Sequence, residues 1–261
     1  MPSGTGARTA FDCNDRRVRI SIGTSGWSYG HWDGVLYPPG TPPWQRLEHY
    51  VGRFDTVELN SSFYRWPMSA SFAAWRRRLP GGFQLSVKAP RGLTHAKRLY
   101  SPDAWIERIA AGWHELGNRR AALLVQLRPD HERDDARLDY FLDRMPSWIR
   151  VAVELRHPSW NDDVVFSMMA GHRAAYCVIS GAHLPCVLRT TSDFVYVRLH
   201  GPDRQHMYAG TYPDADLHWW ADRLREWDGA GKDVFVYFSN DGYGHAVRNA
   251  ETLRSILQGH S

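Results

Sequence analysis

The chain reads Val153-Glu154-Leu155-Arg156 near its middle, and the same alternation occurs at Val57-Glu58-Leu59-Asn60, Val125-Gln126-Leu127-Arg128 and Val197-Arg198-Leu199-His200. Shorter versions are Ser86-Val87-Lys88 and Phe238-Ser239-Asn240. A side-chain period of two is that of a β-strand, so each run presents its polar members on one face and its valines and leucines on the other. In a closed parallel barrel the apolar face packs on helices, and the polar face points inward at the end where barrel enzymes keep their active sites.

Strand and helix patterns alternate along the whole chain. We expect strands at Val18–Gly23, Thr56–Asn60, Phe83–Lys88, Leu123–Leu127, Arg150–Arg156, Ala174–Ser180, Phe194–His200 and Val234–Asn240. Helix signals lie between them, with starts at Ser101-Pro102-Asp103 (serine as cap), Asp134 and Pro213-Asp214 and a last helix over His245–Leu257. The connection between Ser180 and Phe194 carries little helix signal.

This alternation predicts an α/β fold, a single-domain (β/α)8 TIM barrel over residues 18–261, preceded by a disordered tail over residues 1–17. No linker, repeat or low-complexity tract divides the chain. A doubly wound open sheet is the alternative fold. It is disfavoured because the first strand-to-helix turn lacks a dinucleotide-binding fingerprint.

Composition limits the class of protein. The chain has 261 residues, of which 43% are hydrophobic and 23% charged, as in soluble globular proteins. No apolar run reaches the roughly 20 residues that cross a bilayer, and the polar N-terminal stretch lacks a signal-peptide core. We therefore expect a cytoplasmic protein without a membrane partner. The three cysteines show no paired spacing, which argues against a cysteine-based zinc site.

Barrel parity gathers polar side chains around one mouth, and the members expected there are Glu58, Asn60, Lys88, Gln126, Arg128, Glu154, Arg156, Arg198, His200 and Asn240. His157 and Asp241 follow directly in the loops. Carboxylates and cations in a partly dehydrated cleft shift one another's pKa values, as catalysis requires. The alternative is a structural salt-bridge network that joins the glutamates to the arginines. For the deeper layer (Glu58, Gln126, Glu154 and Arg198) the sequence leaves both interpretations open, whereas for the outer layer (Asn60, Lys88, Arg156, His200 and Asn240) it favours a functional role.

Two further patterns lie near the predicted mouth. Aromatic residues just past strand ends could stack on a sugar or a base, and they include Trp27, Tyr29, Tyr64 and Trp160. The glycine-rich run Ser239–His245 precedes the last helix, so its backbone N–H groups could face an anion, unless Asp241 caps the helix itself. The Gly26–Gly30 stretch matches a serine nucleophile elbow by letter only, because a proline-rich loop follows it instead of a helix.

Together these phrases resemble the YecE-like family, a domain of unknown function, over nearly the whole chain from Ile20 to Leu257. The phrases that carry the resemblance are Gly23–Tyr29, Thr56–Arg65, Ser86–Arg91, Leu93–His95, Val153–Trp160, Val197–Gly201 and Tyr237–Asp241. The resemblance implies a TIM barrel with a cleft lined by these phrases, and it implies no established reaction. Arg128 departs from the family pattern, and the sixth strand lacks the acidic residue that usually ends it.

The favoured hypothesis is an enzyme, a hydrolase or a lyase, that acts on an anionic small molecule such as a phosphorylated compound or a nucleotide. In it Glu58, Glu154, His200 and Lys88 are the catalytic candidates. The substrate-binding candidates are Trp27, Tyr29, Asn60, Tyr64, Arg156, His157, Trp160, Arg198, Asn240 and Asp241. The cofactor is unknown, and a divalent metal held by the histidines and carboxylates is disfavoured because cations line the same rim.

Alternative functions remain from the same residues. The first is a nucleic-acid-binding barrel, such as a metal-dependent nuclease, that uses surface arginines and rim aromatics. The others are a glycoside hydrolase that pairs Glu58 with Glu154, a lyase that forms a Schiff base through Lys88, and a binding protein without catalysis.

Overall fold

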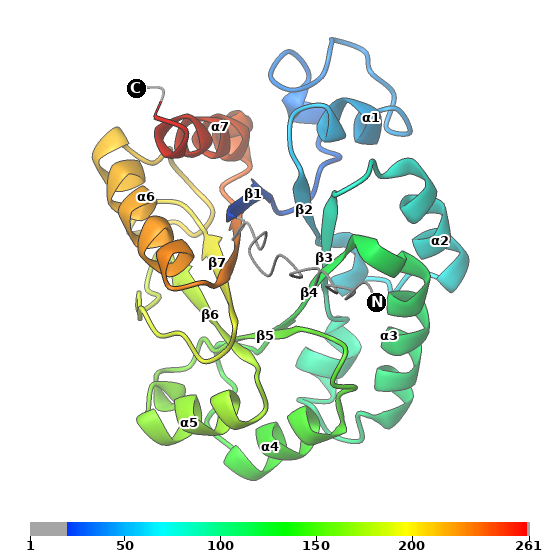
Figure 1. Cartoon of the computed structure of the whole chain (residues 1–261), viewed down its shortest axis with the longest axis vertical. Coiled ribbons are helices and arrows are strands. Elements are labelled where there is room, and N and C mark those ends of the chain that lie inside the picture. Colours follow the sequence, from blue (N-terminus) through cyan, green and yellow to red (C-terminus); the bar gives the residue numbers. More distant parts are fainter. Residues whose placement is uncertain (1–19, 260–261) are drawn as a thin grey trace, which may run out of the picture.

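The structure, a computed structural model, describes residues 20–259, and the predicted tail over residues 1–17 lies outside them. Eight parallel strands form the barrel that the sequence predicts (Figure 1). They are β1 (Ile20–Thr24), β2 (Thr56–Leu59), β3 (Gln84–Lys88), β4 (Arg120–Gln126), β5 (Val151–Glu154), β6 (Ala175–Ser180), β7 (Phe194–Leu199) and β8 (Asp233–Phe238). The α-helices are α1 (Arg46–Val51), α2 (Ser69–Arg78), α3 (Asp103–Leu116), α4 (Asp135–Arg144), α5 (Asp163–Gly171), α6 (Asp214–Gly229) and α7 (His245–Leu257).

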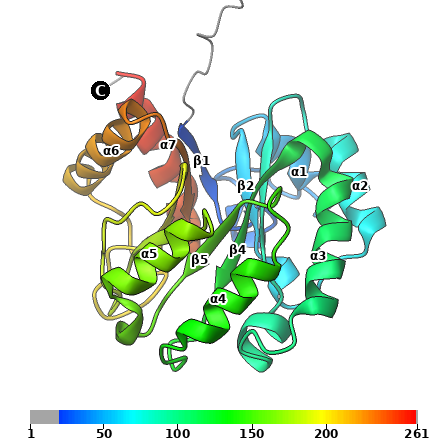
Figure 2. The same ribbon diagram turned by 60° about the horizontal axis from the view of Figure 1, so that its bottom comes forward.

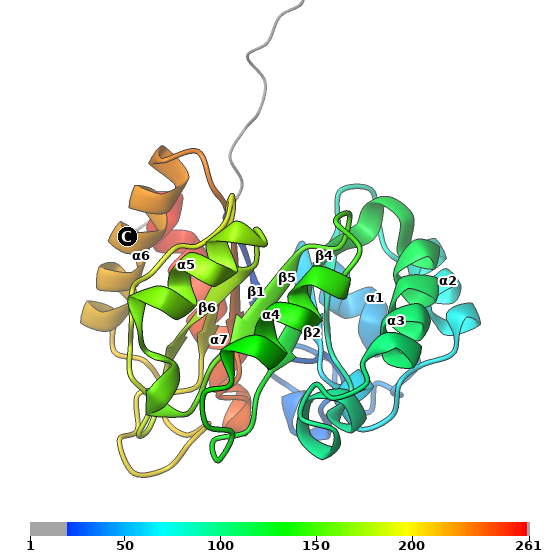
Figure 3. The same ribbon diagram turned by 90° about the horizontal axis from the view of Figure 1, so that it is seen from below.

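The helices surround the strands and cover their outer face. In Figure 2, α4 and α5 lie over the outside of β4 and β5. Figure 3 shows α1, α2 and α3 on one side of the barrel and α6 and α7 on the other. The order around the sheet is β1-β8-β7-β6-β5-β4-β3-β2, so neighbours in sequence are neighbours in space. This order brings the carboxyl ends of all eight strands to one mouth.

The join between β1 and β2 is the weakest part of the barrel ladder. It holds one backbone bridge, in which the N–H of Gly26 donates to the carbonyl of Glu58 at 2.8 Å. The Tyr50 hydroxyl completes it, because it accepts from the N–H of Thr24 at 3.0 Å and donates to the carbonyl of Thr56 at 3.1 Å. Gly23 permits the close approach, since a Cβ there would lie 2.2 Å from the Thr56 oxygen.

Strand parity divides the buried residues into two layers, as the alternation predicts. The valines and leucines of the strands pack outward against the helices in one large core. A second, smaller cluster fills the barrel interior below the mouth, with small residues opposite aromatic ones, and it includes Ala122, Ala152, Cys177, Tyr196 and Tyr237. The charged members of each run stand above this plug, at the mouth. The interior is thus a packed core and not a channel.

Helix boundaries follow the sequence signals with one exception. Asp134 caps α4, since its side chain accepts from the N–H of Arg137 at 3.0 Å. Ser101 does not cap α3: the helix begins at Asp103, and Ser101 has a φ of +46° and makes no capping bond. The prediction of a serine cap was therefore wrong. Between Ser180 and Phe194 the chain forms no helix, as expected. No helix among the described residues is long and apolar enough to cross a membrane.

Candidate active site at the barrel mouth

Arg198 on β7 lies at the centre of a buried ion network. Its Nη1 donates to Oε2 of Glu154 on β5 at 2.6 Å, and its Nη2 donates to Oε1 of Glu58 on β2 at 2.9 Å. The side chains of all three residues are at most 2% exposed. Charges removed from water this completely are stable only when they are paired and hydrogen-bonded. The three strands therefore depend on one another's side chains at this level of the barrel.

Every carboxylate oxygen of the two glutamates is occupied. Glu58 accepts a second bond on Oε1 from the Ser25 hydroxyl at 2.6 Å, and on Oε2 from the Tyr196 hydroxyl at 2.8 Å. Glu154 accepts on Oε1 from Gln126 at 2.9 Å and from Arg156 at 2.6 Å. Three accepted hydrogen bonds thus hold each carboxylate in place between the strands, so the geometry favours a structural role for both.

The same contacts fix the protonation of Glu154. Burial alone would raise the pKa of Glu154, but the guanidinium groups of Arg156 and Arg198 hold this pKa well below its usual range. Glu58 and Glu154 therefore balance Arg198 and Arg156 charge for charge. The two arginines that the sequence suggested as anion ligands are neutralised within the protein.

His200 lies in this network but not at its surface. It is fully buried, with its Nε2 3.6 Å from Oε1 of Glu154, and the ring of Tyr208 packs edge-on against it at 5.1 Å. Burial and the nearby Arg198 lower the pKa of His200 to about 4, so the imidazole is neutral at pH 7. A proton shuttle between His200 and a ligand would need the Tyr208 loop to move.

Lys88, at the end of β3, is the exception to this charge balance. Its side chain is 6% exposed, and its ammonium group stands over the ring of Phe63, 4.3 Å from the ring centre. Within residues 20–259 this ammonium group forms no hydrogen bond and no ion pair. Burial, and after it the charge of Arg198, lowers the pKa of Lys88 to about 7. The ionisable groups that act on it come from four other segments and are Glu58, His95, Glu154, Arg156 and Arg198.

The position of Lys88 is fixed by the turn after β2. The buried Ser62 hydroxyl lies 2.9 Å from the carbonyl of Leu59 and 2.7 Å from that of Lys88, which ties the Ser61–Phe63 turn to the end of β3. Phe63 also contacts His95, whose ring packs edge-on with the ring centres 4.8 Å apart. The Phe63 ring, against which the Lys88 ammonium group packs, has no oxygen that could accept a hydrogen bond from it.

Lys88 lines a cavity of about 240 Å³ at the mouth, which we call the charged cavity. Its lining residues are Ser25, Tyr29, Asn60, Tyr64, Lys88, Arg198, Tyr208, Ser239 and Asp241. A second, mainly apolar hollow of about 350 Å³ shares Tyr29, Asn60 and Tyr64 with it and is completed by Gly26, Trp27, Ser28, Leu59 and Ser61. Three buried polar atoms of the residues that line the charged cavity have no hydrogen-bond partner among the described residues: the Ser239 hydroxyl, Oδ1 of Asn60 and Nε of Arg198. Such atoms are available to a ligand.

The structure brings together most of the residues expected at the site. Tyr29, Asn60, Tyr64, Lys88, Arg198 and Asp241 line the charged cavity, and Trp27 lines the apolar hollow. Arg156 reaches from Glu154 to the Tyr208 hydroxyl, to which its Nη2 donates at 3.1 Å. Glu58, Glu154 and His200 lie beneath the cavity.

Three expected ligand-binding residues lie elsewhere. Trp160 is buried and its indole N–H donates to the carbonyl of His131 at 2.7 Å, so the ring is part of the loop packing. His157 bonds to Ser159 in its own turn. Asn240 is buried, and its Nδ2 donates to the carbonyl of Gly210 at 2.9 Å, where it fixes the long loop before α6.

Sequence reasoning missed four residues at the mouth, which are Ser25, Phe63, Tyr208 and Ser239. Ser25, Phe63 and Ser239 lie within the family phrases, so their positions were visible although their roles were not. Tyr208 stands in an irregular loop, at a φ of +68°, and no periodic pattern points to it. Its approach to Arg156 and His200 is decided only by the folded loop.

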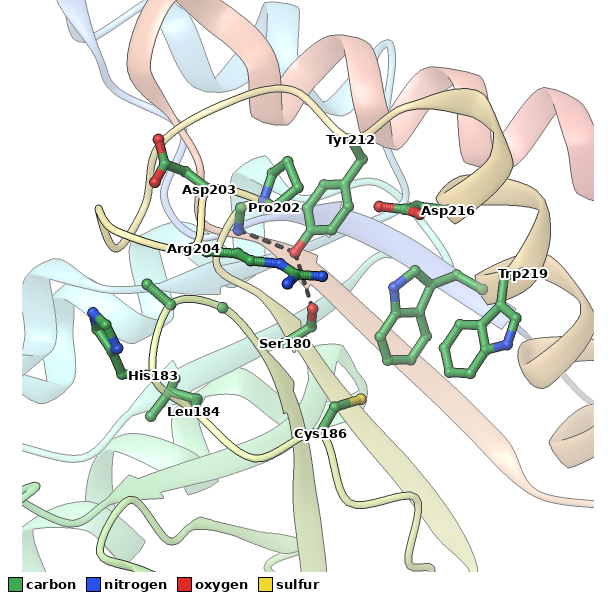
Figure 4. A pocket seen from close by; sticks show the side chains of 14 residues that line it. Ser180, His183, Leu184, Cys186, Pro202, Asp203, Arg204, Tyr212, Asp216 and Trp219 are labelled. Atoms are coloured by element: carbon green, nitrogen blue, oxygen red, sulfur yellow. Dashed lines mark hydrogen bonds between the residues drawn. The ribbon is translucent and has the colours of Figure 1, made fainter.

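A larger cavity of about 610 Å³ lies beside the barrel axis, between the loops after β6 and β7 and helix α6 (Figure 4). The Tyr212 hydroxyl accepts from the N–H of Gly201 at 3.0 Å and lies 3.5 Å from the Ser180 hydroxyl, and Trp219 flanks the opening. The buried ion network lies at the mouth, and none of the unpartnered buried polar atoms of the described residues belongs to the lining of this larger cavity. We therefore place the candidate site around Lys88 despite the greater volume of this cavity.

No group of three or more histidine, cysteine or carboxylate side chains within the described part of the chain is arranged to hold a metal ion. The candidate ligands from the sequence are His157, His200, His245, Glu58, Glu154 and Asp241. In the structure His157 contacts Ser159, His200 lies near Glu154, and Asp241 lies near His31. His31 lies 3.6 Å from the Asp241 carboxylate and 2.8 Å from the Asp241 carbonyl, so this loop is tied to the loop after β1.

Comparison with known proteins shows the family to which the chain belongs. The sequence profile described as "Protein of unknown function DUF72" matches residues 21–261. The chain belongs to the DUF72 family. The UPF0759 protein YunF of Bacillus subtilis (strain 168) is 29% identical over 271 residues, a match that covers 91% of this chain and 94% of YunF. The UPF0759 protein YecE of Escherichia coli (strain K12) is 27% identical over 142 residues, covering 54% of this chain and 50% of YecE.

Solved structures of DUF72 proteins show the same fold. The DUF72 family protein of Thermotoga maritima MSB8 is 28% identical, covers 92% of this chain and 99% of its own, and superposes with a TM-score of 0.82. A DUF72 family protein of Enterococcus faecalis V583 has 18% identity and a TM-score of 0.78, over 92% of this chain and 96% of its own. These names carry no reaction, so the family and the fold are established and the chemistry is not.

Proposed function

We propose that this DUF72 protein is a barrel enzyme that binds an anionic small molecule at the mouth, with Lys88 as the group that meets the negative charge. The observation that carries the proposal is the unpaired Lys88 ammonium, buried over Phe63 in a cavity whose arginines are already neutralised. An enclosed cation without a counter-ion is costly to the folded protein. It is accounted for if a ligand supplies that counter-ion.

The adjoining apolar hollow suggests the rest of the ligand. Tyr29 and Tyr64 border both spaces, and Tyr64 is 70% exposed although it is a large aromatic residue. A planar ring stacked there would bury the exposed tyrosine face, while a phosphate or carboxylate reached Lys88. This combination supports a small substrate with an anionic end and a planar part, and AMP serves as a probe that carries both.

The test is equilibrium binding of two probes, pyrophosphate and AMP, by isothermal titration calorimetry at pH 7. Loss of a charge-assisted contact is worth about 1.5–3 kcal/mol, so Lys88→Met should weaken both probes roughly 10- to 100-fold. Tyr64→Ala should weaken AMP and leave pyrophosphate unchanged. The matched control is Lys97→Met, which removes an exposed lysine of the segment after β3.

Two results would contradict the proposal. One is equal binding of both probes by wild type and Lys88→Met. The other is an equal loss in Lys97→Met, which would mean that the probes respond to overall charge and not to the mouth. Binding should also strengthen as the pH falls from 8 to 6, because an anion binds the protonated amine and the pKa of Lys88 is about 7.

A further inference from the structure

The chain uses lysine very sparingly, and one of its lysines stands at the centre of the mouth. Among its 32 lysine and arginine residues only three are lysines, Lys88, Lys97 and Lys232. Lys97 is exposed, and the ammonium of Lys232 donates to the carbonyl of Ser192. An arginine at position 88 would carry a positive charge as well, so charge alone does not account for a lysine there. What an amine adds is that it can lose its proton and attack a carbon atom.

We propose that Lys88 is a nucleophile that forms an imine with an aldehyde or ketone group of the substrate, an inference that rests on the proposed function. Four observations support this inference. The amine is enclosed, and it forms no hydrogen bond or ion pair with the described residues. It also lines a cavity and packs against the Phe63 ring. Amines are activated for this reaction by removal from water and by a neighbouring cation. Here the enclosure comes from the barrel wall and the cation is Arg198.

The reaction at Lys88 balances without a redox partner. The lone pair of Nζ attacks the carbonyl carbon, a C–N bond forms, and the carbonyl π electrons move to the oxygen. A proton passes from the nitrogen to this oxygen, and a second protonation releases it as one water molecule, which leaves a protonated imine. The Tyr208 hydroxyl and the Asp241 carboxylate line the same cavity and are the groups placed to exchange these protons.

The imine also fits an anionic substrate. Its nitrogen keeps the positive charge of Lys88 inside the cavity, so a carboxylate or phosphate on the substrate still faces a cation. The protonated imine withdraws electrons from the adjacent carbon, which favours loss of a proton or cleavage of a bond there. The substrate class that follows is an anionic carbonyl compound, either a 2-oxo acid or a phosphorylated aldehyde or ketone.

The experiment is borohydride trapping on the intact protein, read by peptide mass. Wild type is incubated at pH 7 with glyoxylate, with dihydroxyacetone phosphate or with neutral acetone, and then reduced. Reduction of the imine adds the mass of the probe less one oxygen atom. At pH 7 about half of the Lys88 amines are unprotonated, against roughly one in a few thousand for an exposed lysine. We expect labelling of Lys88 to exceed that of Lys97 at least about 100-fold with the two anionic probes, and acetone to label it more slowly.

The controls separate this inference from the proposed function. Lys88→Arg keeps a positive charge but has no amine that can attack a carbon atom, so it should lose the adduct. Lys97→Met should keep both the adduct at Lys88 and pyrophosphate binding. If glyoxylate, small enough to enter the cavity, leaves Lys88 unlabelled while pyrophosphate still binds in a Lys88-dependent way, the imine is refuted and the anion site stands. If neither the adduct nor binding depends on Lys88, both proposals fail.

Discussion

Replacement of Lys88 by methionine should make the protein more stable at pH 6, the reverse of what a substitution in a buried site usually does. Methionine has nearly the length of lysine and removes only the charge. The pKa of Lys88 falls from 10.5 to about 7 because the amine is buried and lies near Arg198. At about 1.4 kcal/mol for each pKa unit, enclosure of the ammonium costs roughly 5 kcal/mol when both states are protonated. The contact with Phe63 offsets about 1 kcal/mol of this.

The stability advantage of Lys88→Met over wild type should become smaller as the pH rises. Between pH 7 and pH 10.5 the unfolded chain binds a proton at Lys88 that the folded chain does not, so the free energy of unfolding of the wild type rises with pH in this window. We expect Lys88→Met to be about 4 kcal/mol more stable than wild type at pH 6. About 3 kcal/mol of this difference should disappear by pH 9.5, where the folded wild type holds a neutral amine.

The assay is urea unfolding of both proteins at pH 6 and pH 9.5, with linear extrapolation to water. Lys97→Met is the control and should change the free energy of unfolding by less than about 0.5 kcal/mol, because Lys97 is exposed. A wild type that is as stable as Lys88→Met at pH 6, with no change in the difference at pH 9.5, would refute the reasoning. It would mean that the Lys88 ammonium is compensated within the protein.

Three further predictions concern the network and the barrel closure. Arg198→Met should lower the free energy of unfolding by about 3–5 kcal/mol in urea unfolding, because it leaves two buried carboxylates without their cation; a loss below 1 kcal/mol would contradict the network. Tyr50→Phe should lower the free energy of unfolding by about 1–3 kcal/mol and speed amide exchange at Thr24, whose N–H donates to the Tyr50 hydroxyl; unchanged exchange there would argue that this hydroxyl does not support the join between β1 and β2. The pKa of Glu154 is depressed in the folded protein, so the stability that Glu154 contributes is complete above its unfolded pKa near 4.5 and is lost as the pH falls further. Glu154→Gln should therefore show a free energy of unfolding that falls less steeply with decreasing pH. The same slope in wild type and Glu154→Gln would contradict this.

The balance between Lys88 and the arginines also explains why the site is difficult to recognise from charge alone. From the sequence, Arg156, Arg198 and Lys88 are all candidate anion ligands, because they form a cation-rich rim at the strand ends. The folded protein neutralises both arginines with glutamates, and within residues 20–259 the Lys88 ammonium has no ion-pair partner. Protein sites commonly keep such locally unfavourable groups where function needs them, at a cost in stability.

The sequence by itself determined the strands, their faces and therefore the ring of polar residues at one mouth. These features follow from a local period of two, which holds wherever the strand lies. Glu58, Glu154 and Arg198 could thus be assigned to a deeper layer of the mouth and Lys88 to an outer layer from the sequence alone. The absence of a helix between Ser180 and Phe194 was local in the same sense.

Only the tertiary structure decided which polar groups neutralise one another and which one is left. Salt-bridge partners on β2, β5 and β7 meet across the barrel, at distances set by its curvature and not by spacing along the chain. The same holds for Tyr208, Trp160 and Asn240, whose loops have no periodic pattern to reveal where the side chains go. The period of two in the sequence determines which face of a strand a side chain occupies. Only the closed barrel determines which side chain from another strand lies opposite it.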